Sequence, residues 1–473
     1  MASAVLPKVA LSDARIHAAN EQAAQIAARV NRLPSCKPLW VLTCYVALAG
    51  IFELYDLFQT GYLTPALIRA GVFSKDVHAF GMSDQALFAS ATFLGLFAGS
   101  AFLSPIVDRF GRRKVFMWAL IFYSASTAIM SCQDTAMGVI VFRLLAGVGL
   151  GVELVTTDAY LTEVLPNSII GRAFALMHVI FYMAVPLLAF LSWQLMPASP
   201  LGIEGWRWVT IVGSFGALLA WILRRGLMES PRWLAVRGRA DEAEAVMTAI
   251  EASVVKSTKT ALPSVDAVTP LTEQTGAFSD IWKRPYLGRT VMLVCLNFFQ
   301  TIGFYGFTNW LPSLLSSQGQ SFTHSYFYSF CIAFAYPISA LLWTLTVADR
   351  FERKWLIVAS ALCVTVLGPL FAFAHNNVLT VVLGFCITSC LTLISMSYHP
   401  YQAELYPTSV RARAVGFVYS FSRLSTAFTS FLISFFLNGW GSPGVFALIS
   451  FSMAAVVVSV GVFGQKTQGV TLD

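Results

Sequence analysis

Apolar residues run along this chain in long stretches that short polar segments separate. We count twelve such stretches, each of about 20 residues, the length that a helix needs to cross a bilayer. Six precede the long polar segment 229–287 and six follow it. The pattern predicts an all-α membrane protein with twelve transmembrane helices. The expected spans are 39–66, 84–107, 115–132, 136–162, 171–195, 206–228, 288–315, 323–347, 355–374, 379–403, 411–437 and 443–464.

Composition agrees with this prediction. The chain is 57% hydrophobic and only 12% charged, and soluble domains carry about twice that share of charged residues. Proline and glycine inside the stretches do not exclude helices, because packed transmembrane helices tolerate both residues. We therefore expect the lipid bilayer to surround most of the chain.

A repeat with an offset of 241 residues relates the two groups of spans. Phe58-Gln59-Thr60 returns as Phe299-Gln300-Thr301, and Asp108-Arg109-Phe110 returns as Asp349-Arg350-Phe351. The same register holds over more than a hundred residues, so we predict two pseudo-symmetric six-helix bundles. The expected domains are a cytoplasmic N-terminal segment (1–38), a first half (39–228), a cytoplasmic linker with short helices (229–287) and a second half with a short tail (288–473).

The basic residues indicate the orientation in the membrane. If the N-terminus is cytoplasmic, only Arg69, Lys75 and Arg207 lie outside, while Arg143 and Arg423 lie within spans. The remaining 26 of the 31 Lys and Arg residues then lie in termini or cytoplasmic loops, as the positive-inside rule requires. We predict that both termini are cytoplasmic. The net charge of +7 reflects attraction to the anionic inner leaflet and needs no nucleic-acid partner.

Other features exclude several classes of protein. The chain has no Asn-x-Ser/Thr sequon, which favours a bacterial inner membrane. Six of the eight cysteines lie in predicted spans, and no metal-binding spacing or phosphate-binding glycine loop is present. We therefore expect no metal, no enzyme activity and no cofactor other than protons as the coupling ion.

Charged turns at the cytoplasmic ends of the spans suggest a gate. Positive charge alone explains the basic residues as topology signals, but it does not explain an aspartate at the same register in both turns. Such a carboxylate can pair with arginine and accept hydrogen bonds from a helix N-terminus, so that it closes the cytoplasmic side in one conformation. The expected gate residues are Asp108, Arg109, Arg112, Glu163, Arg172, Asp349, Arg350, Glu404, Arg411 and Arg413.

Several of these motifs resemble a known family. The turn Asp108-Arg109-Phe110-Gly111-Arg112-Arg113-Lys114 resembles the loop signature of the major facilitator superfamily, and Arg143 to Gly149 resembles its span-4 motif. Glu229-Ser230-Pro231-Arg232-Trp233-Leu234 is similar to a motif of the metabolite:proton symporters, a branch close to the sugar porters. That branch includes aromatic-acid and niacin transporters. The resemblance implies the major facilitator fold and transport by alternating access.

Ionisable residues that break the repeat are candidates for proton coupling. Asp56 corresponds to Asn297, and Arg143 to Gly384. A charge at such a depth costs about 2.5–3.5 kcal/mol on insertion scales, so we expect it to have a task. Paired with Arg143, Asp56 stays ionised; without that arginine, burial favours the protonated acid. A span-1 aspartate and a span-4 arginine play this part in the related sugar porters. A static ion pair is the alternative. The expected coupling residues are Asp56, Glu53, Arg143 and Glu153.

Arg423, near the middle of span 11, indicates a binding site. A mid-membrane arginine must face a cavity or pair with an acid, and a guanidinium can hold a carboxylate through two hydrogen bonds. The alternative is a structural pair between Arg423 and a carboxylate such as Glu153. The expected substrate-binding residues are Arg423, Arg143, His178, Gln300, Asn297 and Tyr305.

Together these features predict a proton-coupled importer of a small organic acid, aromatic carboxylates included, that works as a monomer. A sugar or polyol porter would depend on the span-7 amides Asn297 and Gln300, although the doubled glutamine of sugar porters is absent here. A non-transporting sensor with the same fold is the third alternative.

Overall fold

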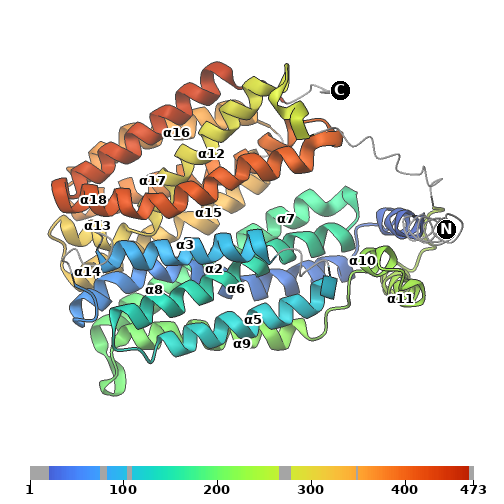
Figure 1. Cartoon of the computed structure of the whole chain (residues 1–473), viewed down its shortest axis with the longest axis horizontal. Coiled ribbons are helices and arrows are strands. Elements are labelled where there is room, and N and C mark those ends of the chain that lie inside the picture. The colour runs from blue at the N-terminus through green and yellow to red at the C-terminus, as the bar shows by residue number, and fades with distance from the viewer. Residues whose placement is uncertain (1–20, 75–82, 104–108, 266–277, 348–349, 468–473) are drawn as a thin grey trace, which may run out of the picture.

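The computed structural model describes residues 21–74, 83–103, 109–265, 278–347 and 350–467. These residues form helices and connecting segments, and they contain no β-sheet. The helices gather into two groups that lie side by side along the long axis of the molecule (Figure 1). The predicted all-α architecture of two six-helix bundles is confirmed.

The first half contains the first six predicted spans. Its helices are α2 (Lys37–Arg69), α3 (Asp84–Phe102), α5 (Arg112–Met130), α6 (Ala136–Val164), α7 (Asn167–Tyr182) with α8 (Ala184–Ala198), and α9 (Gly205–Arg224), with the 3-10 turn η2 (Pro200–Gly202) before α9.

The second half contains the other six spans. Its helices are α12 (Tyr286–Thr308), α13 (Leu311–Ser317), α14 (Phe322–Ala333), α15 (Ala335–Leu342) with the π-helical turn η4 (Trp343–Val347), α16 (Arg353–Ala372), α17 (Asn377–Glu404) and α18 (Thr408–Phe463).

Proline and glycine interrupt three of the spans. The fifth span breaks between α7 and α8 and the eighth between α14 and α15, because Pro186 and Pro337 lack the N–H that would bond to the carbonyl four residues earlier. The helix α18 covers the last two predicted spans and turns at Gly441. The φ angle of 67° at Gly441 lies in the left-handed region that glycine adopts without strain.

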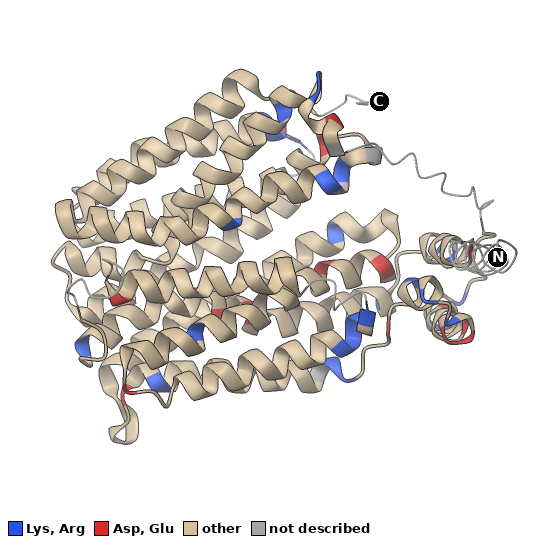
Figure 2. Ribbon diagram, in the orientation of Figure 1, with Lys and Arg blue, Asp and Glu red and all other residues tan. Residues whose placement is uncertain are grey.

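Nine helical segments among the described residues are long and apolar enough to cross a membrane. The longest, Arg413–Phe463, contains two predicted spans. The other two predicted spans, 115–132 and 206–228, coincide with α5 and α9, which carry arginine at their ends. Figure 2 shows that Lys and Arg gather toward the end of the bundle where α2 begins, which we name the terminal end. Few charged residues lie along the middle of the helices.

A small polar unit covers the terminal end of the first half. It consists of the helix over 21–31 together with α10 (Pro231–Val236) and α11 (Ala240–Thr258). Glu251 on α11 accepts hydrogen bonds from Arg29 at 2.7 Å and Arg32 at 2.6 Å. Burial alone would raise the pKa of Glu251, but the two guanidinium groups hold it below its ordinary value. The segment 278–282 forms the short turn η3 (Phe278–Trp282) before α12.

Candidate functional site

Asp56 on α2 and Arg143 on α6 form an ion pair inside the first half. Arg143 Nη1 donates to Asp56 Oδ2 at 2.9 Å, and Arg143 Nη2 donates to the backbone carbonyl of Asp56. Both side chains are at most 1% exposed. The sequence prediction that these two residues reach the same depth is therefore correct, while their coupling role stays a prediction.

A close approach of α3 to α6 supplies a further partner to the arginine. A Cβ atom on Gly95 would lie 2.3 Å from the carbonyl oxygen of Leu144, so only glycine fits there. A Cβ atom on Gly147 would lie 2.5 Å from the carbonyl oxygen of Thr92. This contact brings the hydroxyl of Thr92 to 2.9 Å from Arg143 Nε, which donates to it. The glycines of the span-4 motif thus position Arg143.

Asp56 has two more hydrogen-bond donors. The Thr127 hydroxyl on α5 donates to Asp56 Oδ1 at 3.1 Å, and Gln59 Nε2 donates to the same oxygen. A buried ion pair is stable only when its remaining hydrogen-bonding positions are satisfied. The arrangement therefore fits an ionised Asp56 in this conformation.

A second charged cluster lies in the same half. Arg224, the last residue of α9, donates to Glu53 Oε1 at 2.6 Å and to Glu153 Oε1. Sequence analysis counted Arg224 among the cytoplasmic basic residues, but it is 1% exposed. A signal was available in the charge balance, because the first six spans contain more carboxylates than Arg143 alone can pair with. Glu153 therefore pairs with Arg224 and not with Arg423.

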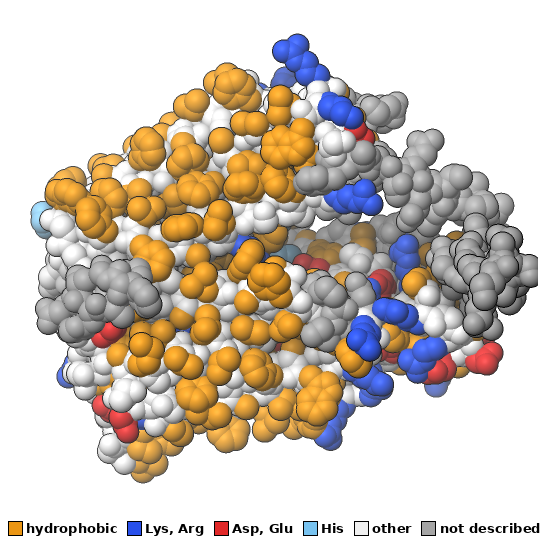
Figure 3. All heavy atoms as spheres, viewed as in Figure 1, with side chains coloured by type: hydrophobic (Ala, Val, Ile, Leu, Met, Phe, Trp, Pro, Cys, Tyr) orange, Lys and Arg blue, Asp and Glu red, His pale blue; other side chains and the backbone are white. Residues whose placement is uncertain are grey.

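Arg423 lies on α18, between the two halves. Its Nη2 donates to the hydroxyl of Tyr419 at 3.0 Å, and its guanidinium stands 5.0 Å from the centre of that ring. Tyr305, Tyr398 and Asp158 are its other electrostatic neighbours. Arg423 keeps intermediate exposure and Asp158 is exposed. Figure 3 shows a hollow between the two halves that opens toward the terminal end.

Two histidines stand near this arginine. His178 Nδ1 lies 2.8 Å from the carbonyl oxygen of Phe174, and its ring is 6.5 Å from that of Tyr182. His399, which sequence analysis missed, is exposed and packs 4.1 Å from the ring of Tyr398. The two histidines are electrostatic neighbours. His399 lies on α17, and the comparison of the two repeats did not single it out.

The structure separates the other expected substrate residues from this group. Asn297 is fully buried and donates to Leu293 O at 2.9 Å and to Gln402 Oε1 at 3.2 Å. Gln300 is 5% exposed and donates to the Thr301 hydroxyl at 3.0 Å. Arg143 is held by Asp56. Tyr305 lies beside Arg423, and His399 is an electrostatic neighbour of both Arg423 and His178. Arg143, Asn297 and Gln300 instead bond to other partners in this conformation.

Of the expected gate residues, Arg112, Glu163 and Glu404 form ion pairs, and the two pairs repeat with the sequence offset. Arg112 Nη2 lies 2.8 Å from Glu163 Oε1, and Arg353 pairs with Glu404 in the equivalent place of the second half. Each pair joins two helices of one half. Their correspondence shows the internal repeat at the level of side-chain contacts.

The remaining gate residues are dispersed. Arg172 donates to the carbonyl of Ser168 at 3.3 Å, and Arg411 donates to the carbonyl of Tyr406 at 3.1 Å. Arg109 stands 5.5 Å from the Phe110 ring. The side chains of Arg350 and Arg413 are exposed. Asp108 and Asp349 lie outside the described residues.

The two halves contact each other at the end opposite the termini. Ser83 Oγ and Ser434 Oγ are 2.8 Å apart, and Gln85 Nε2 donates to Ser313 Oγ at 3.0 Å. A Cβ atom on Gly61 of α2 would lie 2.0 Å from the carbonyl oxygen of Asn309, which follows α12. The structure is thus closed at this end, while the hollow opens at the terminal end.

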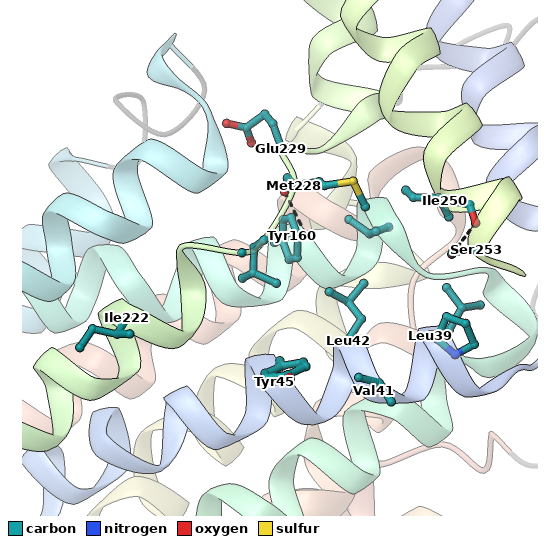
Figure 4. Close-up of a pocket in the computed structure, with 14 residues that line it drawn as sticks. Leu39, Val41, Leu42, Tyr45, Tyr160, Ile222, Met228, Glu229, Ile250 and Ser253 are labelled. Atoms are coloured by element: carbon teal, nitrogen blue, oxygen red, sulfur yellow. Dashed lines mark hydrogen bonds between the residues drawn. The ribbon is translucent and has the colours of Figure 1, made fainter. Parts of the chain in front are cut away.

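A separate cavity of about 580 Å³ lies at the terminal end of the first half (Figure 4). Its walls are mostly apolar and include Leu39, Leu42, Ile222 and Ile250. The Tyr160 hydroxyl donates to the carbonyl of Met228 at 3.0 Å along one side. This cavity lies within the first half and its polar unit, so we do not include it in the site.

Comparison with known proteins agrees with this arrangement. The family model described as sugar (and other) transporter matches residues 42–473. The chain belongs to this transporter family. YyaJ of Bacillus subtilis (strain 168), named as a metabolite transport protein, is 31% identical over 442 residues, which cover 93% of this chain and 95% of YyaJ. The niacin transporter NiaP of Acinetobacter baylyi is 24% identical over 453 residues, which cover 95% of this chain and 99% of NiaP.

A solved structure shows the same fold. The xylose transporter XylE from Escherichia coli, in a partially occluded inward open conformation, matches with a TM-score of 0.74 at 19% identity. The match covers 92% of this chain and 99% of XylE. The predicted membership of the major facilitator superfamily is confirmed, and the chain is a multi-pass membrane transporter and not an enzyme.

Proposed function

We propose that this transporter imports a small organic acid together with protons, and that aromatic carboxylates are among its substrates. The observation that carries the proposal is Arg423. Among the described residues, no carboxylate lies within salt-bridge distance of its guanidinium, although the residue sits in the middle of a span. A cation in such a place requires a cavity or a partner. A substrate carboxylate would supply the missing charge through two hydrogen bonds.

Aromatic side chains around Arg423 support an aromatic substrate. The rings of Tyr305, Tyr398 and Tyr419 lie close to the guanidinium, and His399 stands 5.4 Å from Tyr419. Aromatic faces stack well on a flat ring. His178 and Tyr305 would contact the body of the substrate. Gln300, Asn297 and Arg143 would join them after a conformational change.

Proton coupling would act through Asp56 and Arg143. When Arg143 holds it, Asp56 is ionised; when the arginine moves away, the buried acid takes up a proton. One proton carried with one monoanion is electroneutral, so the pH gradient alone would drive import. Each unit of pH is worth about 1.4 kcal/mol, which is a tenfold accumulation.

We further propose that the terminal end faces the cytoplasm of a bacterial cell, so that the structure is an inward-facing state. The distribution of Lys and Arg supports this orientation. In the other state, the turns around Arg109, Arg350, Arg112 and Arg353 would meet and close the cytoplasmic side. The protein would work as a monomer, with the binding site between its two halves.

Proton-coupled transport of a sugar or polyol is the second candidate. It is supported by the similarity of the fold to that of the xylose transporter and by the polar side chains of Asn297 and Gln300 on α12. A neutral sugar would use these amides as hydrogen-bond partners and would not require the charge of Arg423.

Uptake into proteoliposomes under an imposed pH gradient separates the two candidates. The assay compares aromatic acids, short carboxylates and sugars. Loss of a hydrogen bond to a charged group costs about 1.5–3 kcal/mol, so Arg423→Ala should weaken binding of the transported acid about tenfold to a hundredfold. The control is Arg239→Ala, which removes an exposed arginine of the linker and should leave uptake unchanged. Equal losses for acids and sugars in Arg423→Ala would disprove carboxylate binding at this residue.

A further inference from the structure

The cluster of Glu53, Glu153 and Arg224 has more acids than bases. The three side chains come from α2, α6 and α9, and each is at most 1% exposed. One guanidinium serves both carboxyl groups, with an Nη2 to Oε1 distance of 2.6 Å at Glu53 and a second bond to Glu153 Oε1. If both acids were ionised, the cluster would carry one uncompensated negative charge away from water.

Two oxygen atoms in this cluster have no partner. Within the described residues, neither Oε2 of Glu53 nor Oε2 of Glu153 accepts a hydrogen bond, although both are buried. The two glutamate side chains are within hydrogen-bonding reach of each other. Two ionised carboxylates cannot bond to each other, because both are acceptors only. A carboxylic acid and a carboxylate can.

The groups that face the cluster do not balance its charge. Tyr123 on α5 has a buried hydroxyl without a partner in the described part of the chain, and it is an electrostatic neighbour of both glutamates and of Asp56. Asp158, an exposed residue of α6, is a further acidic neighbour of Glu53. The ring of Phe116 lies 4.6 Å below the Arg224 guanidinium. The neighbours are therefore acidic or neutral.

We propose that Glu53 and Glu153 share one bound proton, so that the two acids and Arg224 form a neutral cluster. The O–H of one glutamic acid donates to Oε2 of the other, and both unpartnered oxygens are then satisfied by one proton. Neutrality also removes the cost of an unpaired charge in a dry site.

The proton in this cluster stays with the first half. Arg224 belongs to α9, which packs on α2, α5 and α8. In Figure 1, α5 and α9 form the edge of the first half that lies farthest from the second half. Movement of one half against the other therefore does not pull the three groups apart. The proposal therefore assigns a resident proton to Glu53 and Glu153 and leaves the transported proton to Asp56. The shared proton does not depend on which substrate is transported.

Infrared spectroscopy of the purified full-length transporter tests this directly. The parent protein at neutral pH should show the carbonyl stretch of a buried protonated carboxyl group, with the small downshift that deuterium exchange causes. In Glu53→Gln the remaining Glu153 pairs with Arg224 as a carboxylate, so the band should disappear. In Glu153→Gln the same band should disappear, because the proton belongs to the pair. The control Asp158→Asn should keep the band, because it leaves both glutamates in place.

Stability supplies an independent readout. Each single variant keeps one carboxylate for Arg224, so its melting temperature should stay close to that of the parent. Glu53→Gln/Glu153→Gln leaves Arg224 without a counter-charge and should lower the melting temperature by more than twice the sum of the single shifts. Survival of the band in either single variant would overturn the shared proton. So would a large loss of stability or failure to fold in a single variant, because that result requires both acids to be ionised.

Discussion

Gly61 controls how closely the two halves meet at the end opposite the termini. A Cβ atom at this position would lie 2.0 Å from the carbonyl oxygen of Asn309 and 2.6 Å from its carbonyl carbon. Real Cβ atoms do not approach other atoms within 3.0 Å, so Gly61→Ala requires the two backbones to separate. The clash exists only in the conformation in which this end is closed.

The expected effect is a shift in the conformational equilibrium. Overpacking of a close contact costs about 1–3 kcal/mol. Because the cost falls on the closed state alone, it converts to about a 5- to 150-fold shift toward the state in which this end is open. Such a shift leaves the binding residues intact but traps more of the protein in one state, so exchange of substrate should slow.

Disulfide formation between cysteines at positions 83 and 434 measures this shift. The hydroxyl oxygens of Ser83 and Ser434 are 2.8 Å apart in the closed state, so Ser83→Cys/Ser434→Cys should oxidise readily there. Mass spectrometry identifies the cross-linked peptide despite the native cysteines. Gly61→Ala should slow formation of this disulfide about 5- to 150-fold. The control Gly416→Ala, whose added Cβ would have no atom within 4 Å, should not slow it. An unchanged rate in Gly61→Ala would refute the reasoning.

Three further predictions concern other parts of the molecule. Asp56→Asn should abolish gradient-driven accumulation in proteoliposomes and spare exchange; accumulation at the parent level would exclude Asp56 as the coupling acid. The pKa of Glu251 is below its ordinary value, so its bonds to Arg29 stabilise the polar unit above about pH 4.3 and are lost as the pH falls through the lowered value. Hydrogen exchange in α11 should therefore rise only at acid pH, and a rise near pH 7 would contradict this. Phe93→Ala should reduce proton-driven accumulation more than it weakens substrate binding, because Phe93 packs against Tyr305. Phe97→Ala on the same helix should change neither.

Much of the fold followed from the pattern of apolar stretches, because the bilayer forces each long apolar stretch to satisfy its backbone hydrogen bonds within a helix. The twelve expected spans all coincide with helical segments. The pairs Arg112–Glu163 and Arg353–Glu404 formed at equivalent places, since a duplicated sequence repeats its contacts as well as its helices. Breaks such as that at Met183 were not predicted in position, because the tolerance of membrane helices for proline hides them.

The candidate site was less predictable from the sequence. Asp56 and Arg143 could be matched because both break the repeat at comparable depths. Arg224 could not, because a basic residue at the end of a span is normally read as a topology signal. His399 was missed because its exposure depends on how α17 packs against the other helices of the second half. Which face of a transmembrane helix lines a cavity depends on its packing with neighbours, and hydropathy does not encode it.

Asp56 lies in the first half and Arg423 in the second, and one helix connects their surroundings. Arg143 of the first half donates to the Thr92 hydroxyl at 2.9 Å. The next residue on α3, Phe93, packs 4.7 Å from the ring of Tyr305 in the second half, and Tyr305 is a direct neighbour of Arg423. A substrate that displaces Tyr305 must therefore move Phe93, and a shift of α3 changes the hydrogen bond that holds Arg143. In the proposed mechanism Arg143 decides whether Asp56 stays ionised, so a substrate at Arg423 would control the proton at Asp56 through these few contacts.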